Sequence, residues 1–125
     1  VGTRFLISDE CLIHENYKEK LLKASDVSTM VTGKSMGDAV RCLKTPFSKK
    51  FFKMEYDPAV PKEEVLDFGK GAMRKAVFDG DNMGSYLAGE VAGMIKKKES
   101  AKDIVEDIMG GAEKLLKNAP SLIVG

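Results

Sequence analysis

The residues best suited to chemistry open the sequence, where Gly2 is followed by Thr3. Glycine lets the backbone approach a ligand closely, and a hydroxyl beside backbone N–H groups can donate to anionic oxygens. Phe5 and the apolar residues near it are typical of a strand that ends at such a turn, with a helix soon afterwards. From these residues alone an ordinary turn is the default interpretation, and a phosphate contact on Gly2 and Thr3 is the alternative.

A second candidate group surrounds His14, the only histidine in the chain. Cys11 precedes it by three residues, which on a helix would place a nucleophile beside a base. A structural histidine that hydrogen-bonds its own neighbourhood is the favoured interpretation. No spacing of His, Cys, Asp and Glu matches a metal site, and the Asp79–Gly84 segment lacks the closing glutamate of a calcium loop. We therefore predict no metal ligand and no catalytic residue.

The third group is a basic stretch with aromatic residues between its lysines. Its lysines are Lys44, Lys49, Lys50 and Lys53, and its aromatic residues are Phe47, Phe51 and Phe52. A formal net charge of +1 predicts no general attraction to nucleic acid or to anionic membranes. The stretch is interpreted as a solvated helix face, or as a docking surface for an acidic protein partner.

The elements that must position these residues form an α-rich chain with one β-hairpin. Helical periodicity predicts helices over Ser8–Ala24, over Phe47–Glu55 and over Pro61–Asp79. The first has Ser8 as N-cap and Lys18 outside, with a break near His14-Glu15-Asn16 as an alternative. β-prone residues at 28–32 and 39–43 predict the hairpin. Ser100 caps a last helix that Pro120 ends, and its expected inner stripe comprises Ile104, Val105, Ile108, Leu115 and Leu116.

A surface of small residues follows Ser85, where Ala88, Gly89, Ala92 and Gly93 recur at helical spacing. Each glycine costs a helix up to about 1 kcal/mol relative to alanine, so close packing against the backbone is expected. A neighbouring helix is favoured over a ligand as the packing partner.

Length and composition predict one globular domain in a reducing compartment. Two cysteines without paired spacing predict free thiols, and no apolar run approaches the length of a membrane span. We therefore expect a cytoplasmic protein. The chain begins without methionine on what resembles the last turn of a strand, so it is expected to be a piece of a longer protein.

Several motifs in fixed order resemble one known group of proteins. They are Gly2-Thr3-Arg4-Phe5, Glu10 with His14-Glu15-Asn16-Tyr17-Lys18, Val31-Thr32-Gly33, Val40-Arg41, Gly69-Lys70-Gly71-Ala72, and Gly80-Asp81 with Gly84-Ser85-Tyr86-Leu87-Ala88-Gly89 and Ala92-Gly93. The set resembles the C-terminal part of FMN-dependent nitronate monooxygenases (2-nitropropane dioxygenases), a group that includes the flavin-dependent enoyl-acyl-carrier-protein reductases.

The resemblance implies the C-terminal portion of a TIM-barrel flavoenzyme. Residues 1–25 would supply the end of barrel strand eight, the phosphate loop and the following helix. Residues 26–125 would form the smaller helical domain with its hairpin at 28–43. Loops after the last strands of such barrels bind phosphate, so the FMN phosphate would lie on Gly2 and Thr3. The segment Ser85, Tyr86, Leu87, Ala88 and Gly89 would approach the flavin ring and the substrate.

Two reactions are compatible with this resemblance. An enoyl-acyl-carrier-protein reductase would use NADH or NADPH to reduce an acyl thioester, and the basic stretch would help to bind the carrier protein. A nitronate monooxygenase would instead oxidise nitronates with oxygen. The family's catalytic histidine lies in sequence that precedes this chain, so His14 does not take that role, and Glu90 replaces a common glutamine. A non-catalytic helical module that self-associates remains a third possibility for the isolated chain.

Overall fold

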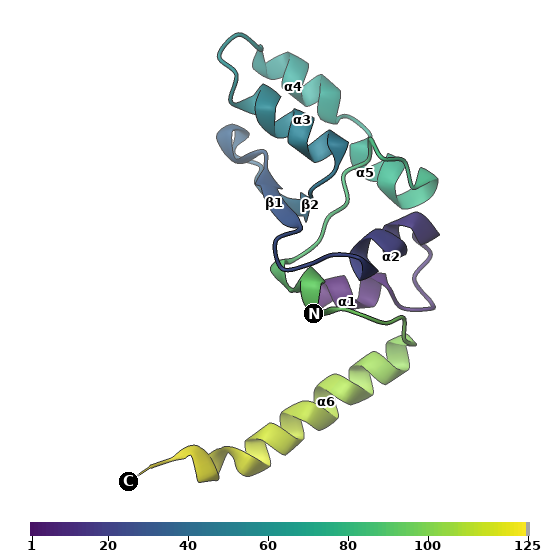
Figure 1. The fold of residues 1–125 in the computed structure, drawn as a ribbon, viewed down its shortest axis with the longest axis vertical. Helices are drawn as coiled ribbons and strands as arrows, with labels where there is room; N and C mark the ends of the chain where they lie inside the picture. The colour runs from purple at the N-terminus through teal and green to yellow at the C-terminus, as the bar shows by residue number, and fades with distance from the viewer. Residues whose placement is uncertain (125) are drawn as a thin grey trace.

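The structure, a computed structural model, describes residues 1–124 and is mainly helical, as predicted (Figure 1). The helices are α1 (Gly2–Leu6), α2 (Glu15–Leu22), α3 (Pro46–Glu55), α4 (Lys62–Gly69), α5 (Ala72–Arg74) and α6 (Ala101–Asn118). The strands are β1 (Thr29–Thr32) and β2 (Val40–Leu43). Short 3₁₀ turns η1 (Lys34–Met36), η3 (Glu90–Met94) and η4 (Ala119–Leu122) and the π-helical turn η2 (Lys75–Asp79) complete these elements.

The predicted hairpin is confirmed, and a third extended segment lies beside it. β1 and β2 pair antiparallel, with Thr32 opposite Val40. The backbone N–H of Leu43 donates to the carbonyl of Tyr86 at 2.8 Å, and that of Ala88 donates to Arg41 at 3.2 Å. The helical spacing of small residues after Ser85 therefore does not produce a helix at Ser85–Gly89, because this segment uses its backbone hydrogen bonds to pair with β2. Only η3 beyond it is helical.

The small sheet separates two apolar layers, because side chains alternate between the faces of extended chains. On one face, Leu43, Tyr86 and Ala88 join the main core, which also contains Ile7, Tyr17, Leu21, Ala24, Ala76, Ala92 and Ile95. On the other face, Thr32, Val40 and Leu87 line a pocket together with residues of α3 and α4. The segment Ser85–Gly89 thus contributes to both layers.

The first long helix does not begin at the predicted N-cap Ser8, and the alternative break near His14 is where it starts. Helix α2 begins at Glu15 rather than near Ser8, and His14 is its N-cap. In the preceding loop the N–H of Asp9 donates to Glu99 and the N–H of His14 donates to Val77. These tertiary hydrogen bonds replace the helical ones. Lys18, predicted to lie outside, is buried in consequence, and its Nζ donates to the carbonyl of Ser8 at 2.7 Å.

Two further boundaries differ from the prediction. The helix expected from Pro61 to Asp79 breaks after Gly69, because Gly71 takes a left-handed conformation with φ +71°. The strand end expected at Val1–Phe5 is instead helix α1. A strand there needs a neighbour to receive its hydrogen bonds, whereas a helical turn satisfies them locally: the N–H of Arg4 donates to the carbonyl of Val1 at 3.1 Å.

Helix α6 leads away from the rest of the molecule (Figure 1). Ser100 caps it as predicted, with its Oγ accepting from the N–H of Asp103 at 3.1 Å. Of the predicted inner stripe, Ile104 is fully buried and Ile108 is partly buried, whereas Val105, Leu115 and Leu116 are exposed. Within residues 1–124, no helix combines the length and apolar character that a bilayer span requires.

Candidate functional site

Thr3 and Gly89, which belong to the two predicted site segments, meet in the structure. The backbone N–H of Gly89 donates to the Thr3 Oγ1 at 2.9 Å, although 86 residues separate them. Thr3 lies on the first turn of α1, and Gly89 ends the extended segment beside β2. The fold therefore brings the expected phosphate contact next to the segment expected near the flavin ring and substrate.

This hydrogen bond fixes how the Thr3 hydroxyl can act. A hydroxyl has one donor hydrogen and two acceptor lone pairs. Gly89 uses an acceptor site, and no acceptor among residues 1–124 takes the Thr3 proton. Gly2 is exposed, and a Cβ added there would meet no heavy atom within 4 Å. The pair thus offers an oriented hydroxyl donor beside open backbone, which is suited to an anionic oxygen.

The small residues after Ser85 pack closely, as expected, and η3, which contains Ala92 and Gly93, contacts helices α1 and α2. A Cβ on Gly93 would lie 2.5 Å from the backbone N of Asp26 and 2.6 Å from the carbonyl carbon of Ser25. A Cβ on Gly89 would lie 3.3 Å from Thr3 Oγ1. The loop after α2 therefore leaves no room for a side chain at Gly93, whereas Gly89 is only tightly packed against the Thr3 side chain.

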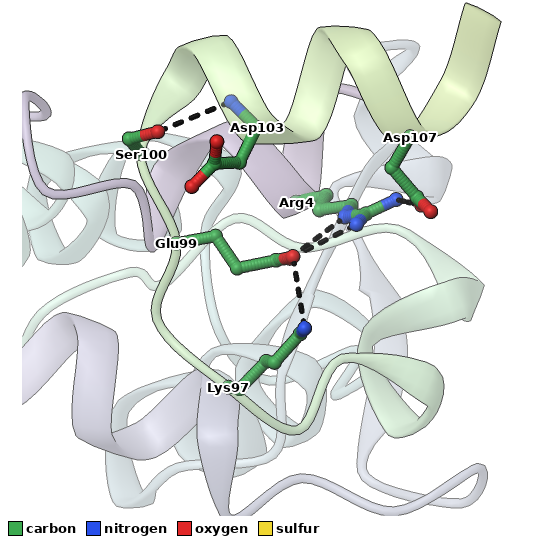
Figure 2. Close-up of polar contacts among 6 residues, drawn as sticks. All are labelled: Arg4, Lys97, Glu99, Ser100, Asp103 and Asp107. Carbon is green, nitrogen blue, oxygen red and sulfur yellow. Dashed lines mark hydrogen bonds and ion pairs between the residues drawn. The ribbon is translucent and has the colours of Figure 1, made fainter. Parts of the chain in front are cut away.

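Arg4 follows Thr3 directly and anchors α6 (Figure 2). Its Nη2 lies 2.9 Å from Glu99 Oε2, and its Nη1 lies 2.8 Å from Asp107 Oδ2. Lys97 reaches Glu99 from the other side at 3.2 Å. Hydrogen bonds to Asp107 and Glu99 raise the pKa of the Arg4 guanidinium above its ordinary value. Because two carboxylates occupy this guanidinium, Arg4 serves as a clamp between α1 and α6.

Acidification is expected to loosen this clamp. The hydrogen bond from Arg4 lowers the pKa of Glu99 below its ordinary value of 4.5. A lowered folded-state pKa means that the stabilisation is complete above pH 4.5 and disappears as the pH falls through the folded-state pKa. NMR spectra of the Arg4 Nε–H and the α6 amides, recorded from about pH 6 to about pH 3, should show one shared transition. In Glu99→Gln that transition should vanish, and an unchanged transition in this variant would contradict the assignment to Glu99.

The segment Ser85–Gly89 is held in place on both sides. Tyr17 donates its hydroxyl to the carbonyl of Leu87 at 2.7 Å, and Tyr86 donates to the carbonyl of Asp81 at 2.7 Å. The two rings meet edge to face with centroids 4.8 Å apart. Burial raises the pKa of the Tyr17 hydroxyl, which keeps it protonated as a donor. No local pattern in the sequence indicates this hydrogen bond from Tyr17 across the chain.

The other candidate residues of the sequence make contacts that support the fold. His14 Nδ1 accepts from the N–H of Asn16 at 3.1 Å, as expected of a structural histidine. Both cysteines are free thiols, and Cys42 is buried. Glu90, which replaces a common glutamine, forms an ion pair with Arg41 at 2.8 Å. The division of the chain at residue 25 remains a prediction.

Comparisons with known proteins agree with the order of the motifs. A family model described as nitronate monooxygenase matches residues 1–111. A probable nitronate monooxygenase of Staphylococcus saprophyticus is 26% identical over 117 residues, covering 93% of this chain and 32% of that protein. FabK from Thermotoga maritima superimposes with a TM-score of 0.89 at 36% identity, covering 97% of this chain and 38% of FabK.

A point mutant of the same FabK matches with a TM-score of 0.78 at 34% identity, over 97% of this chain and 36% of the mutant. The chain thus spans between 32% and 38% of the length of these relatives. The family model nevertheless covers most of the chain and includes both Thr3 and Gly89. The chain therefore belongs to the nitronate monooxygenase family.

Proposed function

We propose that the chain is the C-terminal part of an FMN-dependent oxidoreductase of the enoyl-acyl-carrier-protein reductase type, which uses NADH or NADPH. The contact between Thr3 and Gly89 carries this proposal, because it joins the two segments that a flavin site in this family would need. The likeness to FabK, an enoyl-acyl-carrier-protein reductase, supports the reductase type over the other branch of the family.

Gly2 and Thr3 fit a flavin phosphate. The open space over Gly2 admits an anionic group, and the Thr3 hydroxyl has a proton to donate once its oxygen accepts from Gly89. A hydrogen bond to a charged group contributes more than a neutral one, about 1.5–3 kcal/mol. We assign Gly2 and Thr3 to the phosphate and the segment Ser85–Gly89 to the neighbourhood of the ring and the substrate.

Bound FMN would supply the hydride chemistry between the nicotinamide and the enoyl double bond. The chain's own residues would orient the flavin and the substrate and enclose one edge of the site. Tyr17 fixes the carbonyl of Leu87, β2 holds the backbone of Tyr86 and Ala88, and Thr3 holds the end of the segment at Gly89. These fixed contacts would keep one edge of the site rigid and exclude water from it.

We also propose an acyl carrier protein as the source of the substrate. The four lysines of the basic stretch, Lys44, Lys49, Lys50 and Lys53, are all exposed, and the last three lie on α3. Such a surface attracts an acidic partner and raises the rate of encounter.

A second function, nitronate monooxygenase, is favoured by the family model and by the staphylococcal relative. Assays of the full-length protein distinguish the two functions. Anaerobic flavin reduction by NADH or NADPH, followed by turnover of an enoyl thioester, is the result expected for the reductase. Nitronate consumption with oxygen and no oxidation of nicotinamide would instead establish the monooxygenase.

The isolated 125-residue chain is expected to bind FMN negligibly. It supplies one phosphate contact and one edge of the site, whereas a flavin is held by several segments of a barrel. Absorbance spectra of the purified chain after dialysis against FMN test this expectation. A stoichiometric yellow complex would overturn the assignment of the chain as a partial site.

A further inference from the structure

A pocket of about 370 Å³ opens between the hairpin, α3 and α4. Its wall includes Thr32, Val40, Phe47, Phe51, Leu66 and Leu87. Pockets for small ligands occupy about 300–1,000 Å³ and are mainly apolar with a few polar groups. This pocket has that size and that character.

Two buried hydroxyl residues also line the pocket. Thr32 is 3% exposed, and its Oγ1 has only a long contact of 3.9 Å with Cys42 Sγ. Ser85 is 8% exposed, and its hydroxyl makes no hydrogen bond within residues 1–124. No buried side-chain oxygen within residues 1–124 lacks a partner, so the Ser85 hydroxyl oxygen is open to solvent at the pocket wall and can donate a hydrogen bond to a group in the pocket.

The pocket lies beside the same extended segment that ends at the contact between Thr3 and Gly89. In an extended segment, residues two apart share a face, so Ser85, Leu87 and Gly89 lie on the face opposite to the buried Tyr86. Ser85 and Leu87 line the pocket, and a Cβ on Gly89 would point at Thr3. From Ser85 to Gly89 an extended chain covers about 13 Å. One face therefore leads from the pocket to the proposed phosphate site.

We propose that this pocket holds the acyl chain of the thioester substrate, an inference that rests on the proposed reductase function. The thioester would lie near Leu87, and the hydrocarbon would run along the pocket wall that Phe47 and Phe51 form. The charged residues at the wall are Lys70, which forms an exposed ion pair with Asp67 at 2.5 Å, and Asp38, which is exposed at the rim. The exposed Lys49 and Lys53 lie on α3, the helix that also supplies Phe47 and Phe51, so an acidic carrier could dock beside the entrance.

Chain-length dependence in the full-length holoenzyme tests the proposal. The kcat/KM for crotonyl, hexenoyl, octenoyl and decenoyl coenzyme A thioesters should rise by up to about fourfold per methylene until the pocket is full. Leu66→Trp fills the pocket at its exposed wall and should reduce that rise to less than about twofold per methylene. Tyr56→Trp is a matched control, since Tyr56 and Leu66 are 51% and 56% exposed and only Leu66 lines the pocket.

Calorimetry with butyryl and decanoyl coenzyme A provides a readout that needs no turnover. The dissociation constant should fall strongly with chain length in the wild type and in Tyr56→Trp, and only weakly in Leu66→Trp, with bound flavin unchanged in all three. Equal chain-length dependence in all three proteins overturns the acyl pocket, even when crotonyl thioester is reduced. If no enoyl thioester is reduced, the reductase function fails, and the calorimetry still decides the pocket.

Discussion

Replacement of Tyr86 by alanine is expected to lower the free energy of unfolding by about 3–5 kcal/mol, the usual cost of removing a large aromatic side chain from a core. Tyr86 is fully buried and packs edge to face on Tyr17. It also lies between Ser85 and Leu87, so the cavity would undermine the segment that forms the edge of the site. Urea unfolding of the chain, followed by circular dichroism, measures this loss.

Tyr86→Phe is the matched control for this prediction. It keeps the ring and removes the hydrogen bond to the carbonyl of Asp81, which should cost only about 1 kcal/mol. If alanine and phenylalanine destabilise the chain equally, the hydroxyl rather than the buried ring is the main contribution, and the described core is wrong.

Thr3→Val is expected to weaken FMN binding by the full-length protein roughly 10- to 150-fold. This range corresponds to the loss of one hydrogen bond to a charged group, about 1.5–3 kcal/mol. Valine has nearly the shape of threonine, but it can neither accept from the N–H of Gly89 nor donate to a phosphate. The dissociation constant, obtained from flavin fluorescence on titration of the apoprotein, measures the effect.

Thr3→Ser should restore affinity to within a few-fold of the wild type, because the hydroxyl returns. Riboflavin, which lacks the phosphate, should bind Thr3→Val and the wild type equally. A loss of riboflavin affinity as large as the loss for FMN would show that Thr3 supports the fold of the site rather than the phosphate.

Local signals predicted the elements whose hydrogen bonds are local. Ser100 begins α6 and Pro46 begins α3, where Thr45 and Ser48 form a capping box. The hairpin followed from β-prone residues around a glycine-containing loop. These features depend on neighbours within a few residues, which a sequence displays directly.

Elements fixed by distant partners were predicted wrongly. The segment from Ser85 has small residues at helical spacing, yet it is extended because β2 lies beside it. Ser8 has the form of an N-cap, but tertiary hydrogen bonds to Glu99 and Val77 hold the loop that follows it. No local pattern reports such partners, which lie far away in sequence.

In the candidate site, too, residues could be predicted but their contacts over long sequence distances could not. The resemblance to a known family named Thr3 and Gly89, but neither residue type nor spacing indicated that they touch. The pocket beside Ser85 could not be expected either, because its wall comes from segments between Thr32 and Leu87. Only the three-dimensional arrangement connects the pocket with the face that reaches Thr3.

A crystal structure of the full-length protein with FMN tests the central claim most directly. The account predicts a phosphate oxygen within about 2.5–3.0 Å of Thr3 Oγ1, the range of O–H···O hydrogen bonds, with Gly89 still donating to the same hydroxyl. A phosphate bound elsewhere, with the Thr3 hydroxyl facing solvent or protein alone, would contradict it.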